Sequence, residues 1–185
     1  MTIAINIRGT GGSGKSTVVK RIMELYGTHR RPEFVDGRKR PLRYQFGGLP
    51  APLVVLGHYE TACGGCDTIK TVDQVYQEVR GALEINCHVL YEGIMCQDDV
   101  RRAVELSKEH KLHVIRLNTP IEECLAGIRA RREARGEEKP LNEKNTRGRY
   151  ESVIRTCSRL VAQGVSVEVL DREAAFLRVR ELLGV

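Results

Sequence analysis

The chain has 185 residues, enough for one domain of ordinary size with a buried core. Hydrophobic residues make up 41% of it and charged residues 29%, which is typical of a globular protein and argues against a disordered one. No apolar run approaches the roughly 20 residues that a membrane-spanning helix needs, and residues 1–7 lack the basic start and long apolar stretch of a signal peptide. We therefore expect a cytoplasmic protein.

The net charge of +6 and the isoelectric point of about 9.1 describe a mildly basic chain. Such a chain can bind a polyanion, although many proteins reach this charge without such a partner. The 6 cysteines are expected to be free thiols, because cytosolic reductants keep thiols reduced.

The first part of the chain predicts a strand, a glycine loop and a helix. Residues 2–7 are rich in β-branched side chains, which favour a strand. Residues 13–26 carry apolar side chains at helical spacing. Residues 28–50 are basic and interrupted by glycine and proline, so we expect an irregular excursion or a hairpin with Asp36 and Gly37 at its turn.

The rest of the chain alternates strands with helices. After a strand at 52–59 and a loop at 61–71, we expect a helix at 72–85, a strand at 88–94, a helix at 98–110, a strand at 112–117, a helix at 121–135, a mobile polar stretch at 136–149, a helix at 150–163, a strand at 165–170 and a helix at 173–183. This alternation implies a three-layer α/β fold, with a parallel sheet flanked by helices. No repeat or boundary interrupts it, so residues 1–185 are expected to form a single domain.

A phosphate-binding loop follows the first predicted strand. It consists of Gly9, Thr10, Gly11, Gly12, Ser13, Gly14, Lys15, Ser16 and Thr17, and it fits G-x-x-x-x-G-K-[ST] at every fixed position. Backbone N–H groups of such a loop surround the phosphates, and the following helix adds the positive end of its dipole. Lys15 would reach the β- and γ-phosphates, and the Ser16 hydroxyl would hold Mg²⁺. The sequence therefore predicts binding of ATP and Mg²⁺.

Two classes of nucleotide-binding protein do not fit the chain. A GTPase should offer N-K-x-D, and residues 142–145 do not match that pattern. An ATP-driven motor should carry an apolar strand that ends in Asp or Asp-Glu, whereas the strand here ends in a single Glu92 before Gly93.

Taken together, these features resemble the small phosphoryl-transfer kinases of the P-loop class. These include nucleoside and nucleotide kinases and polynucleotide kinase. The resemblance implies an arginine-bearing lid, which would lie at about residues 121–149 and contain Arg129, Arg131, Arg132 and Arg135. Guanidinium groups neutralise the charge that spreads over a moving phosphoryl group. We expect Arg129 and Arg132, which share a helix face, to be catalytic, while others lie on a solvated face.

The acceptor hydroxyl needs a carboxylate to position it and receive its proton. Candidates that follow predicted strand ends, where open α/β sheets bind ligands, are Asp36, Glu60, Asp67 and Glu92. We expect Asp67 or Glu92 to act as this base. The alternatives are that Glu92 holds Mg²⁺ through water and that Asp67 caps a helix or a turn.

The loop at 57–67 suggests what is phosphorylated. Its residues Gly57, His58, Tyr59, Cys63, Gly64, Gly65, Cys66 and Asp67 are similar to the acceptor loop of phage P-loop kinases that phosphorylate 5-hydroxymethyluracil within DNA. The resemblance implies DNA as the acceptor, ATP as the donor and the host cytoplasm as the location. A zinc site at the C-x-x-C pair with His58 is a weak alternative, because no second pair follows.

A basic segment fits a DNA substrate. It contains Arg30, Arg31, Arg38, Lys39, Arg40 and Arg43, with Tyr44 and Phe46 beside them. Cations bind phosphates, aromatic rings stack on exposed bases, and a base inside a duplex would have to be flipped out. If DNA is the acceptor, we expect this segment and the loop at 57–67 to line one cleft.

Other readings of the same features remain open. The basic segment could instead be a charged surface hairpin of a nucleoside, nucleotide or other small-molecule kinase. A polynucleotide 5′-end kinase and a nucleotide-binding regulator without kinase activity are further alternatives. In the resembling kinases the loop after the last strand touches the adenine, which makes Arg172 the candidate contact here.

Overall fold

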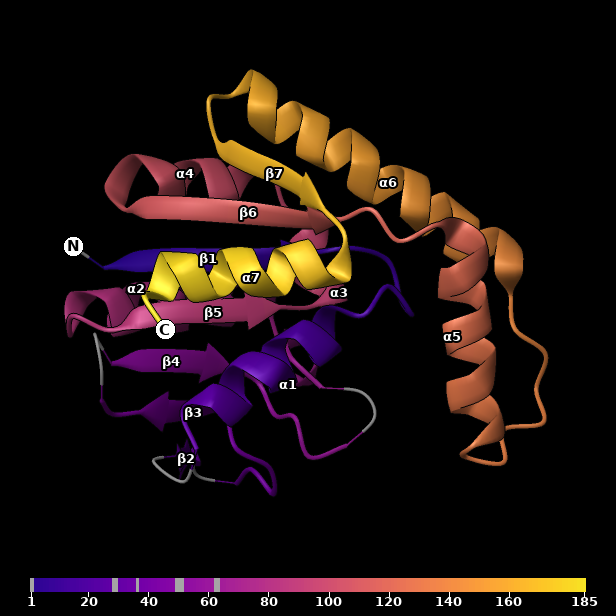
Figure 1. Ribbon diagram of the computed structural model, residues 1–185, viewed down its shortest axis with the longest axis horizontal. Coiled ribbons are helices and arrows are strands. Elements are labelled where there is room, and N and C mark those ends of the chain that lie inside the picture. The colour runs from indigo at the N-terminus through magenta and orange to yellow at the C-terminus, as the bar shows by residue number, and fades with distance from the viewer. Residues whose placement is uncertain (1, 28–29, 36, 49–51, 62–63) are drawn as a thin grey trace.

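The computed structural model describes residues 2–27, 30–35, 37–48, 52–61 and 64–185. Its strands form one sheet in the order β2-β3-β4-β5-β1-β6-β7 (Figure 1). The strands are β1 (Ile3–Arg8), β2 (Arg30–Glu33), β3 (Arg43–Phe46), β4 (Leu53–Leu56), β5 (His88–Glu92), β6 (Lys111–Leu117) and β7 (Ser166–Leu170).

Helices fill most of the connections between the strands. They are α1 (Lys15–Leu25), α2 (Val72–Glu84), α3 (Ile94–Gln97), α4 (Arg101–Glu109), α5 (Ile121–Glu133), α6 (Glu143–Ala162) and α7 (Arg172–Leu183), with a 3₁₀ turn η1 at Cys66–Thr68. None of the described helices is both long enough and apolar enough to cross a membrane.

The sheet is parallel except at one edge. Strands β4, β5, β1, β6 and β7 pair in parallel, which confirms the predicted α/β class. β3 is antiparallel to β4 and β2 is antiparallel to β3, so the basic segment forms a hairpin that widens the sheet. Of the predicted turn residues, Gly37 has a φ of 79°, and Asp36 lies outside the described residues.

Two apolar layers separate the sheet from its helices. Ile5 and Ile7 of β1 pack toward α1 and α7, where they meet side chains such as Val18 and Val179. The opposite layer contains Ala4 of β1 and side chains of α2, α4 and α6. This alternation along β1 buries both faces of the sheet, and the three-layer architecture is compatible with a P-loop kinase fold.

The second half of the stretch at 136–149, which the sequence predicted as a mobile polar segment, is helical. Helix α6 begins at Glu143 rather than near Tyr150, because the Asn142 side chain caps it by accepting a hydrogen bond of 3.0 Å from the Asn145 N–H. Thr146 is buried one turn later and fixes the start of the helix. Helix α5 stands beyond the carboxyl ends of the strands, and α6 leads back from it to β7 (Figure 1).

Gly57, which follows β4, lies where the chain approaches Gly65, and a substitution at Gly57 tests this close approach. Its φ is +84°, and a Cβ placed there would lie 2.1 Å from the carbonyl oxygen of Gly65. We expect Gly57→Ala to lower the free energy of unfolding by about 1–3 kcal/mol, because the backbone must move. Denaturant unfolding followed by circular dichroism measures it.

The matched control is Gly81→Ala in α2, where nothing lies within 4 Å of an added Cβ. Alanine there should raise the free energy of unfolding by roughly 0.5–1 kcal/mol, because Gly is the weaker helix former. If Gly57→Ala and the wild type had the same free energy of unfolding, the close approach of Gly57 to Gly65 would be wrong.

Candidate functional site

The phosphate loop connects β1 to α1 and is held by close backbone contacts. Gly12 has a φ of +78°, and a Cβ there would lie 2.1 Å from the carbonyl oxygen of Cys124 on α5. A Cβ on Gly14, whose φ is +96°, would lie 2.5 Å from Cδ of Arg172. Glycine is therefore required where α5 and the start of α7 touch the loop.

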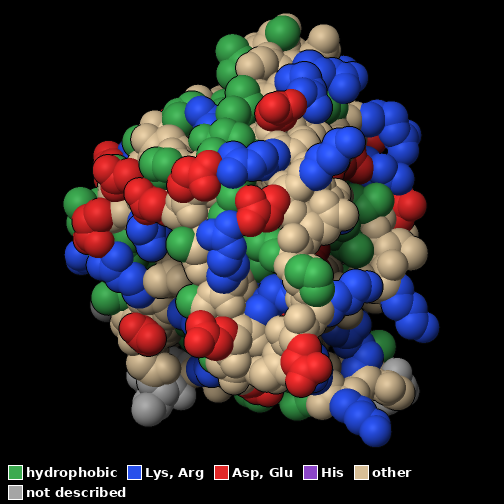
Figure 2. Space-filling view, turned by 90° about the vertical axis from the view of Figure 1, so that its right-hand side faces the viewer, with side chains coloured by type: hydrophobic (Ala, Val, Ile, Leu, Met, Phe, Trp, Pro, Cys, Tyr) green, Lys and Arg blue, Asp and Glu red, His purple; other side chains and the backbone are tan. Residues whose placement is uncertain are grey.

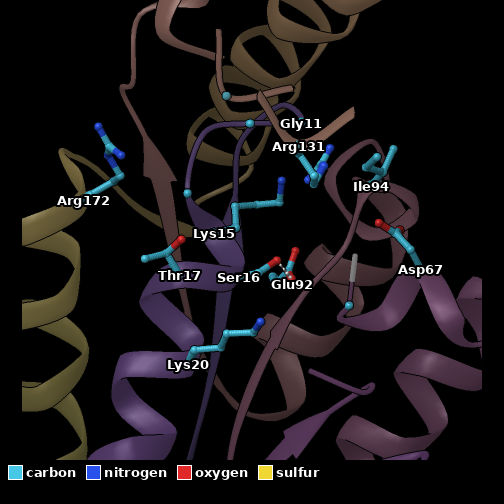
Figure 3. Close-up of a pocket in the computed structure, with 14 residues that line it drawn as sticks. Gly11, Lys15, Ser16, Thr17, Lys20, Asp67, Glu92, Ile94, Arg131 and Arg172 are labelled. Atoms are coloured by element: carbon cyan, nitrogen blue, oxygen red, sulfur yellow. Dashed lines mark hydrogen bonds between the residues drawn. The ribbon is translucent and has the colours of Figure 1, made fainter. Parts of the chain in front are cut away.

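Lys15 places its ammonium group inside the loop. The side chain is 6% exposed, and Nζ donates to the carbonyl oxygens of Gly9 at 2.6 Å and Thr10 at 3.1 Å. Figure 3 shows it rising into the same cavity as Ser16 and Glu92. These two carbonyl bonds hold the charge in place next to the backbone N–H groups that would receive a phosphate.

Glu92 lies beside the loop because β1 and β5 pair in parallel, with Ile7 level with Glu92. The Ser16 Oγ donates to its Oε1 at 2.7 Å (Figure 3). Glu92 is 2% exposed, and this burial raises the pKa of the carboxyl, an effect opposed by the nearby Lys15 charge and the Ser16 hydrogen bond.

The residues at this position fit a magnesium ion. A hydroxyl and a carboxylate oxygen side by side are the hard oxygen ligands that Mg²⁺ prefers, and Mg²⁺ takes few protein ligands when phosphates supply others. No cluster of three or more His, Cys, Asp or Glu that could hold a metal occurs among the described residues. The zinc alternative involves Cys63, which lies outside them, while Cys66 is a buried free thiol.

Asp67 is exposed in the same cavity, in the 3₁₀ turn η1. Its Oδ1 accepts a hydrogen bond of 3.2 Å from the N–H of Met95. The glycines before it let its loop cross against β5, since a Cβ on Gly65 would lie 2.5 Å from Oε1 of Glu92. The close backbone approach explains why this loop is rich in glycine, and it brings the two predicted carboxylates together.

A cavity of about 380 Å³ joins these groups. The charged side chains that line it are Lys15, Lys20, Asp67, Glu92, Arg131 and Arg172. Lys20 was not singled out from the sequence. It lies four residues after Ser16 and therefore on the same face of α1, a spacing that indicates its position.

The arginines of α5 lie at different places around the cavity. Arg129 forms an ion pair with Glu143, Arg132 Nε lies 2.9 Å from Glu137, and neither residue lines the cavity. Arg131 does line it, and its charge opposes the rise that burial causes in the pKa of Glu92. Gly127 packs against Gly12 and lies four residues before Arg131 on the same helix face. This contact between distant parts of the chain sets which arginine faces the cavity, and the spacing along the sequence does not reveal it.

Arg172 lies at the cavity as its position after β7 predicted. It is the first residue of α7, and its Nη2 lies 3.2 Å from Glu123 on α5. The side chain therefore lies between α5 and Gly14 of the phosphate loop.

The basic segment and the acceptor loop are in contact. Arg38 Nη2 donates to the carbonyl oxygen of Thr68 at 3.0 Å, and Arg40 Nη1 lies 3.0 Å from Nε2 of the buried His58. Asp67 of the loop lines the cavity, whereas residues of the basic segment do not. The two segments are neighbours, as expected, but they do not line the same cavity. Figure 2 shows Lys and Arg side chains across the face at the carboxyl ends of the strands.

The two remaining carboxylates that the sequence offered lie elsewhere. Glu60 is exposed, and its Oε1 lies 3.2 Å from Nη2 of Arg30 and 3.2 Å from the Tyr44 hydroxyl oxygen. It does not line the cavity. Asp36 lies outside the described residues. Asp67 and Glu92 are therefore the two of the four candidates that the structure brings to the phosphate loop.

Comparison with known proteins connects this site to a family. No model of a known protein family matches the chain. It is 47% identical over 182 residues to the 5-hmdU DNA kinase of Pseudomonas phage PaMx11, covering 97% of this chain and 96% of that protein. The 5-hmdU DNA kinase of Delftia phage PhiW-14 is 27% identical, covering 87% of this chain and 65% of that protein. That of Pseudomonas phage M6 is 25% identical, covering 97% and 96%. The chain therefore belongs to the family of phage 5-hmdU DNA kinases.

Proposed function

We propose that this protein transfers the γ-phosphate of ATP to the hydroxyl of the 5-hydroxymethyl group of uracil in DNA. The observation that carries the proposal is one cavity that joins the phosphate loop to two carboxylates, Asp67 and Glu92. Membership of the family, at 47% identity over nearly the whole chain, supports both the reaction class and the acceptor.

The donor side of the reaction rests on the phosphate loop. Lys15 would exchange its bonds to the Gly9 and Thr10 carbonyls for the β- and γ-phosphate oxygens. Mg²⁺, when bound, would neutralise charge on those phosphates, and Ser16 and Glu92 are the residues that would hold it. The buried position of Glu92 below Ser16 suits this role better than that of a base for an incoming acceptor.

The acceptor side rests on Asp67. Its Oδ1 is engaged by the Met95 N–H, which fixes the carboxylate and leaves Oδ2 for the substrate hydroxyl. The hydroxymethyl oxygen would attack the γ-phosphorus, the bond to the bridging oxygen would break, ADP would leave, and the proton would pass to Asp67. Charge that develops on the moving phosphoryl group would be met by Lys15 and Arg131.

We also propose that residues 121–149 form the lid within a single kinase domain. Arg131 is its best-placed catalytic arginine in this structure. Arg129 and Arg132 remain candidates for a closed lid, because exposed ion pairs such as theirs are worth only about 0–1 kcal/mol and rearrange cheaply. Arg172 is the proposed contact for the adenine.

The direct test uses γ-labelled ATP with DNA that contains 5-hydroxymethyluracil, with unmodified DNA and with free nucleosides. Label is expected on the modified DNA alone, and Lys15→Ala should lower the rate by at least about 10²-fold while melting like the wild type. Label on the 5′ ends of unmodified DNA would replace the proposal with an end kinase. Label on nucleosides alone would show a small-molecule kinase instead. If no acceptor is labelled at all, the protein is a nucleotide-binding regulator without kinase activity.

The lid assignment is tested by ranking arginine variants. Arg131→Ala should lower kcat by about 10²-fold, more than Arg129→Ala or Arg132→Ala, because only Arg131 of the three lines the cavity. Arg155→Ala serves as the matched control, since Arg155 is exposed on α6 and pairs with Glu151. A larger loss at Arg129 or Arg132 would mean that lid closure brings those side chains to the phosphates.

Glu92→Gln should separate stability from activity. Because burial raises the pKa of Glu92, the folded state binds this proton more tightly than the unfolded state does. The free energy of unfolding of the wild type therefore falls as the pH rises from the ordinary carboxyl pKa through the raised value. The variant lacks this fall, so thermal melts without nucleotide should show it more stable than the wild type at pH 8, by a margin that shrinks toward pH 4.5.

The same Glu92→Gln protein should lose roughly 10²-fold or more in phosphoryl transfer, because an amide replaces the carboxylate that would hold Mg²⁺. Asp67→Asn is the matched comparison, since it removes the proposed base from an exposed position and should lower kcat without a comparable gain in stability. If the Glu92→Gln protein melted at a lower temperature than the wild type at pH 8, the claim that burying the charge of Glu92 destabilises the fold would be wrong.

A further inference from the structure

Two adjacent apolar side chains are exposed at the end of β2. Phe34 is 58% exposed and Val35 is 46% exposed, although most large apolar residues of the described chain are buried in the two layers beside the sheet. They occupy the connection between β2 and β3, which continues through Gly37 to Leu42. Together they form a local apolar patch on an otherwise charged segment.

The topology places this connection at the catalytic edge of the sheet. Because β3 is antiparallel to both neighbours, β2 runs in the same direction as β4, and Glu33, Arg43 and Leu56 lie level with one another. Phe34 and Val35 therefore leave the sheet at the carboxyl end of the parallel strands. The phosphate loop and Glu92 lie at that same edge.

Two contacts fix the connection to the acceptor loop. Arg38 Nη2 donates to the carbonyl oxygen of Thr68, the residue after Asp67, at 3.0 Å. Arg40 Nη1 lies 3.0 Å from Nε2 of His58, which accepts the bond because a guanidinium can only donate, and burial lowers the pKa of this histidine. The position of Phe34 and Val35 is thus linked through the backbone to the carboxylate that faces the acceptor.

The hairpin carries cations that no carboxylate of the described residues neutralises. These are Arg31, Arg38, Lys39 and Arg40, whereas Arg30 pairs with Glu60 and Arg43 pairs with Glu33 and Glu78. Many arginines elsewhere are paired too, among them Arg80, Arg102, Arg129, Arg147, Arg172 and Arg178. Unpaired cations around an exposed apolar tip match the two components of a nucleic acid, phosphates outside and stacked bases inside.

The catalytic cavity imposes a requirement that such a tip would meet. Lys15 of the phosphate loop is 6% exposed inside a cavity of about 380 Å³, and the C5 substituent of a paired base points into the major groove of the duplex. To bring a hydroxymethyl oxygen to Asp67 and the phosphate loop, a nucleotide must leave the base stack, which costs a few kcal/mol. An apolar side chain that fills the gap in the stack recovers part of this cost.

We propose that Phe34 and Val35 enter the base stack beside the target nucleotide, while Arg31 and Lys39 bind the flanking phosphates. The inference rests on the proposed function and adds to it the element that extrudes the base. Arg38 and Arg40 are positioning residues in this arrangement, since they hold the hairpin against the loop that carries Asp67.

The test compares phosphoryl transfer to one 5-hydroxymethyluracil oligonucleotide as a single strand and as a duplex. Phe34→Ala should lower kcat/KM on the duplex by about tenfold and on the single strand by less than about twofold, because a single strand needs little unstacking. Leu177→Ala is the matched control, since Leu177 is 51% exposed on α7. It should leave both rates unchanged.

A second measurement follows the DNA itself. With 2-aminopurine next to the target base, the wild type should raise its fluorescence on binding the duplex, and Phe34→Ala should raise it less. Lys39→Ala should reduce the salt slope of duplex binding by about 1, whereas Phe34→Ala should leave the slope unchanged.

The outcomes separate this inference from the proposed function. If the wild type labels neither form of the modified DNA, the proposed function fails. If it labels both and Phe34→Ala affects them equally or not at all, the function stands and the wedge is wrong. An unchanged salt slope in Lys39→Ala would likewise remove the hairpin from the DNA-binding surface.

Discussion

The site depends on the parallel pairing of β1 with β5, which sets Ile7 level with Glu92. Since β1 lies between β5 and β6 in the sheet, the loop that leaves β1 emerges where the strand connections diverge, the position at which open α/β sheets bind ligands. The pairing brings the Ser16 hydroxyl within 2.7 Å of the Glu92 carboxylate, although 76 residues separate them along the chain. A shift of one residue in this register would turn Glu92 to the other face of the sheet.

Close backbone contacts then build the rest of the cavity around that pair. Gly12 allows α5 to lie on the phosphate loop, and Gly65 allows the acceptor loop to cross in front of Glu92. Both contacts leave no room for a Cβ, so α5 and the loop with Asp67 come closer to their neighbours than any residue but glycine would allow. This arrangement buries a carboxylate and a lysine in one place, a cost in stability that provides charge where phosphoryl transfer needs it.

The sequence predicted the parts of this site that local pattern determines. The phosphate loop is encoded in consecutive residues, and Glu92 and Asp67 could be placed because strand ends of a parallel sheet share one edge. The choice among the lid arginines could not be made from spacing, because the side of α5 that faces the cavity is set by the contact of Gly127 with Gly12, far away in the sequence. The start of α6 was missed for a different reason. The polar composition of residues 136–149 suggested mobility. The structure instead begins α6 at Glu143, where Asn142 caps the helix and Thr146 is buried one turn later.

The two elements beside the cavity differ in how their charges are satisfied. Arg129 and Arg132 of α5 are paired with Glu143 and Glu137, so phosphate contacts made by these side chains would replace existing ion pairs. Arg31 and Lys39 of the hairpin have no carboxylate partner among the described residues, so contacts with a polyanion would cost them no internal bond. Salt weakens exposed charges in both elements, but Arg31 and Lys39 would gain new ion pairs without losing any made with the described residues. The dependence of DNA binding on salt should therefore come mainly from the hairpin, and the dependence of kcat on lid charge should come from Arg131.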